Sequence, residues 1–312
     1  MENNGSWERD VIEKIALSAI EEQKRARKWR IFFRASTLLL VIVTLWWVFG
    51  KDSSRSMSSS GKHIAEVQLR GEISSDNTSA EKIIQGLDDA YEDPNTVAVI
   101  LRINSPGGSP VQAGQIYDEI IRLKKSHSTI PIYAVVEDLC ASGAYYVASA
   151  TDKIYVDKAS IVGSIGVIMN GFGFTDTMKK LGVERRLIIA GENKAFLDPF
   201  SPANAKQMAY ASGMLEQIHQ QFIQAVRMGR GSRLKETPDM FSGLVWTGER
   251  SIQLGLTDAL GSVKSLSRDV IKVKNIIDYT PTEDITDRIA KRLGSTESRM
   301  SWQSFLNVLP IN

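Results

Sequence analysis

The chain has 312 residues, of which 43% are hydrophobic and 24% charged, so it carries enough apolar side chains for a globular core and is not a disordered chain. The net charge of +2 gives no reason to expect a nucleic-acid partner, and the single cysteine, Cys140, excludes an intrachain disulfide. The histidines His63, His127 and His219 lie far apart and lack the spacing of metal ligands, so no metal and no cofactor are expected.

The first 30 residues are predicted to form a cytoplasmic tail, with an amphipathic helix over residues 8–28. Basic side chains gather near the end of this tail, at Lys24, Arg25, Arg27, Lys28, Arg30 and Arg34. Fewer basic residues follow the next apolar segment, at Lys51, Arg55 and Lys62. This excess of positive charge predicts that the N-terminus lies in the cytoplasm and that everything after residue 50 lies outside it.

Residues 31–50 form a long apolar run and are predicted to span the membrane once as a helix. The charged side chain of Arg34 can extend to the lipid headgroups, and tryptophans lie near both ends of the run. One alternative is a cleaved signal peptide, which requires small residues where this chain has Trp46-Trp47-Val48-Phe49. Another is a buried core helix, which fits badly beside residues 51–62, a serine-rich segment predicted to be a flexible linker.

Residues 63–275 alternate between strand and helix patterns, and residues 276–312 are predicted to be a C-terminal extension. Such alternation predicts an α/β domain with largely parallel strands. A capping-box pattern of Thr78 and Glu81 marks one helix start, and Ser201-Pro202 marks another. In chain order, the predicted elements are a strand at 63–73, a helix at 78–91, a strand at 97–103, a helix at 110–125, a strand at 130–136, a helix at 141–150, strands at 153–156, 161–169 and 184–190, and helices at 201–228 and 247–254.

The segment Asn104-Ser105-Pro106-Gly107-Gly108 lies between a predicted strand and a predicted helix. Its two glycines allow backbone N–H groups to point outward at an anion, as they do in an oxyanion hole. The alternative is a tight turn that requires glycine only for its backbone conformation.

Ser142 lies in a second junction of this kind, within residues 138–146. A serine at such a junction presents its hydroxyl at the carboxyl end of the strand, where open α/β sheets bind ligands. The N-terminus of the following helix stabilises negative charge nearby. The alternative is a serine that caps the helix.

Lys194 lies among aromatic and apolar neighbours in residues 191–200. Surroundings that exclude water make the neutral form of a lysine available as a base. The alternative is a solvated loop lysine. A histidine base is disfavoured, because no histidine lies between His127 and His219, and His219 is flanked by glutamines and is expected to be solvated.

Taken together and in this order, the three segments resemble the signal peptide peptidase A family, which has the Clp/crotonase fold of repeated β-β-α units. The resemblance covers roughly residues 63–262 and includes further motifs at 160–167, 246–249 and 255–258. It implies that Ser142 is the nucleophile and Lys194 the general base. It also implies that Gly108 and Gly143 supply the oxyanion N–H groups and that Ser164 orients the lysine. Asn193 departs from the family, in which many relatives have an aromatic residue at this position.

The resemblance further implies a membrane-anchored serine endopeptidase that degrades signal peptides and similar apolar peptides after secretion. The expected location is the bacterial inner membrane, with one span and the catalytic domain on the periplasmic or extracytoplasmic side. Short members of the family form rings in which adjacent subunits supply the serine and the lysine, so a homo-octamer is expected. Two other functions stay open: a crotonase-type acyl-CoA enzyme, and an inactive scaffold that binds membrane partners. The presence of both Ser142 and Lys194 favours the peptidase.

Overall fold

The computed structural model describes residues 17, 23–25, 27–43 and 61–281, and the chain divides into two units, residues 1–59 and 60–312. In the first unit, residues 27–43 are helical and their large apolar side chains are exposed. Most of the tail helix predicted at 8–28 and the last part of the predicted span, residues 44–50, lie outside the described residues. Among the residues that are described, no helix is both long and apolar enough to cross a bilayer.

The second unit is built around an eight-stranded sheet within residues 61–281. Its main path runs in the order β6-β5-β3-β2-β1-β8, and β4 pairs with β3 and β7. Only the pairing of β5 with β6 is antiparallel among these strands. The strands are β1 (His63–Arg70), β2 (Thr96–Ser105), β3 (Ile132–Ala141), β4 (Lys153–Val156), β5 (Ile161–Gly163), β6 (Val245–Thr247), β7 (Ala259–Leu260) and β8 (Ile276–Asp278).

Helices connect the parallel strands, as crossover connections require. The α-helices of this unit are α2 (Ala80–Glu92), α3 (Pro110–Ser126), α4 (Gly143–Ser149), α5 (Thr175–Lys180), α6 (Ala205–Arg230), α7 (Gly248–Gln253) and α8 (Val263–Ser265). A short 3₁₀ helix, η2 (Gly231–Arg233), follows α6, and a π-helical turn, η3 (Leu266–Ile271), follows α8. The expected α/β class with largely parallel pairing is therefore confirmed.

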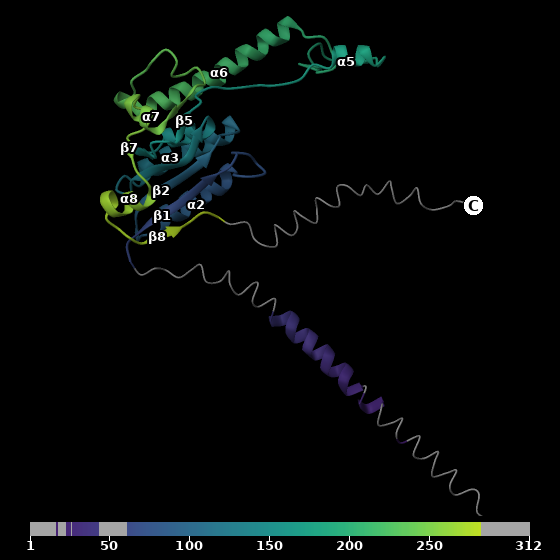
Figure 1. The fold of residues 1–312 in the computed structure, drawn as a ribbon, viewed down its shortest axis with the longest axis vertical. Coiled ribbons are helices and arrows are strands. Elements are labelled where there is room, and N and C mark those ends of the chain that lie inside the picture. The colour runs from purple at the N-terminus through teal and green to yellow at the C-terminus, as the bar shows by residue number, and fades with distance from the viewer. Residues whose placement is uncertain (1–16, 18–22, 26, 44–60, 282–312) are drawn as a thin grey trace, which may run out of the picture. The chain divides into compact units, whose positions relative to one another are not determined.

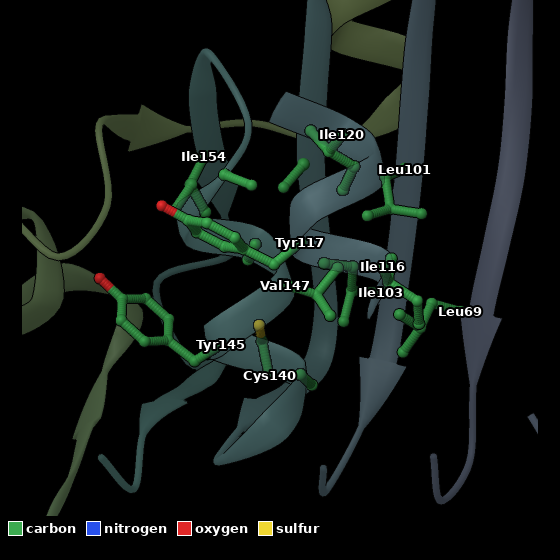
Figure 2. Packing of buried hydrophobic residues seen from close by; sticks show 14 of the residues in the cluster. Leu69, Leu101, Ile103, Ile116, Tyr117, Ile120, Cys140, Tyr145, Val147 and Ile154 are labelled. Atoms are coloured by element: carbon green, nitrogen blue, oxygen red, sulfur yellow. The ribbon is translucent and has the colours of Figure 1, made fainter. Parts of the chain in front are cut away.

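The main core lies between one face of the sheet and helices α2, α3 and α4 (Figure 2). Leu101 and Ile103 on β2 are fully buried, as are Ile116 and Ile120 on α3. Burial of each such side chain stabilises the fold by roughly 1.5–3 kcal/mol relative to exposure, so this contact fixes α3 on the sheet. A smaller cluster on the other face includes Ile64, Ile100, Val135, Tyr155 and Leu266.

Several predicted boundaries are wrong. β3 extends to Ala141, whereas β5 ends at Gly163 and no strand forms at residues 184–190. The cap of α2 is Ser79 rather than Thr78, and α6 begins after Asn204, whose side chain accepts hydrogen bonds from the N–H groups of the first turn. The sheet also includes β8, which lies beyond residue 275.

The first half of α6 lies apart from the main core. Its buried residues are Ala211 and then a group from Phe222 onward, whereas Met208 near its start is 53% exposed. In Figure 1, α5 lies near the N-terminal end of α6, away from the sheet. We refer to residues 166–210, which include α5 and the start of α6, as the arm.

Candidate active site

Three predicted site segments meet because the strands that precede them are neighbours. β3 lies between β2 and β5, and all three run parallel. Cys140 is paired with Ser105 on one side and with Val162 on the other. The residues just beyond this line are Gly107 and Gly108 after β2, Ser142 after β3 and Ser164 after β5. They therefore share the carboxyl edge of the sheet, where α/β folds bind ligands.

Ser142 occupies the sharp turn between β3 and α4. Its φ of 54° and ψ of −126° are unusual for a residue with a side chain, and its N–H donates to the Gly163 carbonyl at 2.8 Å. Although Ser142 is at the cap position of α4, its side chain makes no capping hydrogen bond. The capping alternative is therefore wrong. The half-buried hydroxyl has no hydrogen-bond partner among the described residues, so it is available to react.

Two backbone N–H groups lie beside this serine. A methyl group built on Gly107 would lie 2.6 Å from the Gly143 nitrogen and 2.8 Å from Ser142 Cβ, and one on Gly143 would lie 3.3 Å from the Gly108 nitrogen. The two loops are thus in direct contact. Within the part of the chain that the structure describes, neither the Gly108 N–H nor the Gly143 N–H donates to any acceptor. Paired free N–H groups of this kind can hold an oxyanion.

The glycine loop is held in place by Ile73. The Ile73 N–H donates to the Gly107 carbonyl and the Ser109 N–H donates to the Ile73 carbonyl, both at 2.8 Å. Gly107 has a φ of 95° and Gly108 a φ of 147°, conformations that side-chain-bearing residues rarely adopt. These hydrogen bonds fix the loop backbone in one conformation, in which the Gly108 N–H stays free to bind an oxyanion. The sequence pattern indicated both glycines, and the family resemblance gave the donor role to Gly108; the close contact of Gly107 with the nucleophile loop is visible only in the structure.

Ser164 lies next to the nucleophile loop. Its φ is 53°, and its N–H donates to the Leu244 carbonyl at 2.7 Å. The preceding residue, Gly163, accepts the hydrogen bond from Ser142. Ser164 therefore directly follows the residue that accepts the hydrogen bond of the nucleophile's backbone N–H.

Lys194 lies elsewhere, on the arm. It is exposed, and no hydrogen bond or ion pair joins it to Ser142 or Ser164 in the described part of the chain. Its loop packs against the start of α6: Leu197 N–H donates to Gln207 Oε1 at 3.0 Å, and the Phe196 and Tyr210 rings lie 5.8 Å apart. Tyr210 is twelve residues before Phe222, or about 18 Å along the helix axis.

The nucleophile helix contacts the opposite end of α6. The rings of Tyr146 on α4 and Phe222 on α6 lie 5.0 Å apart, and a methyl group on Gly229 would lie 1.9 Å from the Ser149 carbonyl oxygen. The same helix therefore holds the Ser142 element near its C-terminal end and the Lys194 loop near its N-terminal end. One chain does not bring the two side chains together.

His219 differs from the expectation of a solvated side chain. It is half-buried, and its Nε2 lies 3.1 Å from the Ile165 carbonyl oxygen. Helical periodicity could have placed it on the side of α6 that faces the sheet edge, but the flanking glutamines obscured this.

The chain is similar to known and putative proteases. Residues 124–276 match Peptidase family S49. A putative protease of Methanocaldococcus jannaschii is 31% identical over 258 residues, which cover 77% of this chain and 82% of that protein. A putative signal peptide peptidase SppA of Enterococcus faecium is 26% identical over 290 residues, 82% of this chain and 84% of that protein.

A Na(+)/H(+) antiporter NhaA of Brucella abortus is 42% identical over 223 residues. The match covers 68% of this chain but 30% of the antiporter, so the chain spans less than a third of that relative.

The mixed α/β sheet places an unpartnered serine at a strand–helix junction beside two free N–H groups, an arrangement that serine peptidases use. The chain belongs to peptidase family S49, the family of signal peptide peptidase A, as the resemblance predicted.

Proposed function

We propose that the protein is a membrane-anchored serine endopeptidase in which Ser142 is the nucleophile and Lys194 the general base. The observation that carries this proposal is the free Ser142 hydroxyl beside the unpaired N–H groups of Gly108 and Gly143. The family's Clp/crotonase architecture agrees with strands and helices that alternate in this way.

In the first step, the neutral amine of Lys194 takes the proton of the Ser142 hydroxyl while its oxygen attacks the peptide carbonyl carbon. The carbonyl oxygen becomes an oxyanion that accepts hydrogen bonds from the Gly108 and Gly143 N–H groups. One such donor is typically worth about 2.7–4 kcal/mol of transition-state stabilisation. The C–N bond then breaks as the lysine gives its proton to the leaving amine, which leaves an acyl-serine. Water, deprotonated by the same lysine, releases the second product and restores Ser142.

Lys194 reaches a serine of a neighbouring chain in this proposal. The separation of Lys194 from Ser142 along α6 supports a shared site. The arm also exposes large apolar side chains, with Ile168 and Phe172 each 82% exposed and Ile188 97% exposed. Such a surface is typical of a protein interface. A closed ring of identical chains, expected to be an octamer, would repeat this contact around a symmetry axis.

Residues 31–50 serve as the anchor, with the N-terminus in the cytoplasm and the catalytic unit on the extracytoplasmic side of a bacterial inner membrane. The exposed apolar side chains of helical residues 27–43 support this, because large exposed apolar surfaces mark contacts with a membrane or another protein. The positive charge before residue 35 supports the orientation.

The anchor places the site near apolar peptides left in or beside the bilayer, so signal peptides remaining after secretion are the proposed substrates. The named relative from Enterococcus faecium supports this choice. The match to the antiporter covers 30% of that protein, so its name gives no support for ion transport here. An acyl-CoA enzyme or an inactive scaffold would leave the free hydroxyl of Ser142 without a role.

The dyad is tested by cleavage of a signal-peptide-like substrate with the detergent-solubilised full chain. Ser142→Ala and Lys194→Ala should each abolish cleavage, and the double variant should be no worse than either, because members of one catalytic unit are not additive. The matched control is Lys206→Ala, an exposed lysine at the start of α6. A Lys194→Ala enzyme with wild-type activity would refute the mechanism.

The topology is tested with reporter fusions. Alkaline phosphatase fused after residue 55 should be active, because it folds only outside the cytoplasm, whereas a fusion after residue 20 should be inactive. The reverse pattern would overturn both the orientation and the location.

A further inference from the structure

His219 connects the middle of α6 with the segment that carries Ser164. Its Nε2 is 3.1 Å from the Ile165 carbonyl oxygen. A carbonyl oxygen only accepts hydrogen bonds, so the imidazole carries its proton on Nε2 and donates it. The Nδ1 atom has no hydrogen-bond partner among the described residues.

The segment Ser164–Gly166 is held from two sides. On one side, the Ser164 N–H donates to the Leu244 carbonyl at 2.7 Å, and a methyl group on Gly166 would lie 3.1 Å from Gly243 Cα. On the other side lies His219. The Ile165 side chain between these contacts is fully buried in the core.

This segment has a conformation that requires support. Ser164 has a φ of 53°, a conformation that residues with a side chain rarely keep unless their surroundings hold it. The preceding residue, Gly163, accepts the hydrogen bond of the nucleophile's own N–H. A shift of Ile165 would therefore move Ser164 relative to Ser142.

We propose that His219 is a positioning residue: its Nε2–H···O hydrogen bond to Ile165 fixes the Ser164 hydroxyl beside the nucleophile. This inference rests on the proposed function, in which Ser164 orients the catalytic lysine. It extends that function to a residue on α6, the helix that also holds the Lys194 loop. A base role for His219 is the competing hypothesis, because this tautomer leaves a lone pair on Nδ1. A glutamine at this position keeps the donor but cannot accept the proton, so it separates the two roles.

A double-mutant cycle on the full chain in detergent tests the proposal, with kcat and KM measured on an apolar signal-peptide-like substrate. His219→Phe keeps a ring but removes the donor and should lower kcat roughly five- to tenfold with little change in KM. His219→Gln, whose Nε2–H can reach the same carbonyl, should recover most of this loss. In a Ser164→Ala background, His219→Phe should cause no further loss, because its effect is exerted through Ser164. Gln217→Ala, an exposed substitution on the same helix, is the control.

Additive losses from Ser164→Ala and His219→Phe would overturn the proposal, since they would show that His219 acts independently of Ser164. His219→Gln as inactive as His219→Phe would also overturn it and would favour a histidine base. If His219→Phe fails to fold, His219→Asn takes its place in the cycle, because its shorter amide cannot reach Ile165. Failure of the proposed function has a different signature: the wild-type chain does not cleave, or Ser142→Ala retains activity.

Discussion

The chemistry at Ser142 depends on backbone conformations that few residues adopt. Ser142, with a φ of 54°, turns its hydroxyl out of the helix start instead of capping it, and Gly107 leaves room for it. A positive φ at a residue with a side chain costs about 1–3 kcal/mol and is typical of functional sites. The site thus retains an unfavourable conformation that the packing of β2, β3 and α4 maintains.

Gly107 provides a prediction at this scale. Gly107→Ala would place a methyl group 2.6 Å from the Gly143 nitrogen on a residue with a φ of 95°, so the two loops must separate. We expect kcat to fall by about 100-fold or more, the loss typical of a removed oxyanion donor. Peptide cleavage by the purified chain measures this.

The matched control is Gly114→Ala on α3, where nothing lies within 4 Å of the new methyl group. There alanine should raise the free energy of unfolding by about 0.5–1 kcal/mol, because glycine disfavours a helix interior. Full activity of Gly107→Ala would contradict the proposed oxyanion hole.

That these segments meet at one edge of the sheet could be predicted from the sequence, whereas their contacts with other elements could not. Ser142, Gly108 and Gly143 follow buried strands, and parallel strands bring such junctions to one edge. The hydrogen bond of His219 could not be predicted, because it depends on the path of residues 164–166 after a strand that ends early. The separation of Ser142 from Lys194 could not be predicted either, because it depends on how α6 packs against the rest of the domain.

At the scale of elements, the α6 end that supports the nucleophile helix is fixed by a buried ion pair. Arg230, on the last turn of α6, has a fully buried side chain whose Nη1 donates to Asp258 at 2.9 Å, and Asp258 also accepts from Arg233 and from the Ile154 N–H. The motif at 255–258, recognised in the sequence as a family feature, therefore ties α6 to β4.

Asp258→Asn should destabilise the chain by roughly 3–5 kcal/mol, because it leaves the buried Arg230 without its counter-charge. Burial raises the pKa of Asp258, but the hydrogen bonds and charge of Arg230 outweigh it, and the pKa lies below its ordinary value. The stabilisation is therefore complete above about pH 4, the usual range of an aspartate, and is lost as the pH falls through the lower folded-state pKa.

Thermal unfolding across pH measures this effect: the gap between wild type and Asp258→Asn should narrow in acid. The control is Asp269→Asn, which removes an exposed pair with Arg268 and should change stability far less, because water screens such a pair. Equal effects of the two substitutions at neutral pH would contradict the structural role of Asp258.

Helices that are determined by their own capping residues and turns were predicted well. Strands, which form only when another strand lies beside them, were predicted less well. α3 has its cap, Ser109, and a proline at its first position, and it lies where expected. The sequence favours a strand at residues 184–190, but a strand needs a neighbouring strand for its hydrogen bonds, and Ile188 is 97% exposed instead.

At the scale of the whole molecule, the arm explains why a single chain is an incomplete enzyme in our proposal. It carries Lys194 at one end of α6, while Ser142 and its two N–H donors lie at the carboxyl edge of the sheet. The exposed apolar residues of the arm require a partner, and a second copy of the chain would supply it together with a serine. Activity should then depend on assembly and fall when the protein is diluted to monomers.

The most direct test of this central claim is to mix Ser142→Ala protein with Lys194→Ala protein, each inactive alone, and to measure peptide cleavage after exchange of subunits. The account predicts that activity returns, because some interfaces pair an intact Ser142 of one chain with an intact Lys194 of another. Two different affinity tags verify that mixed assemblies form. Mixed assemblies that remain inactive would contradict the shared site.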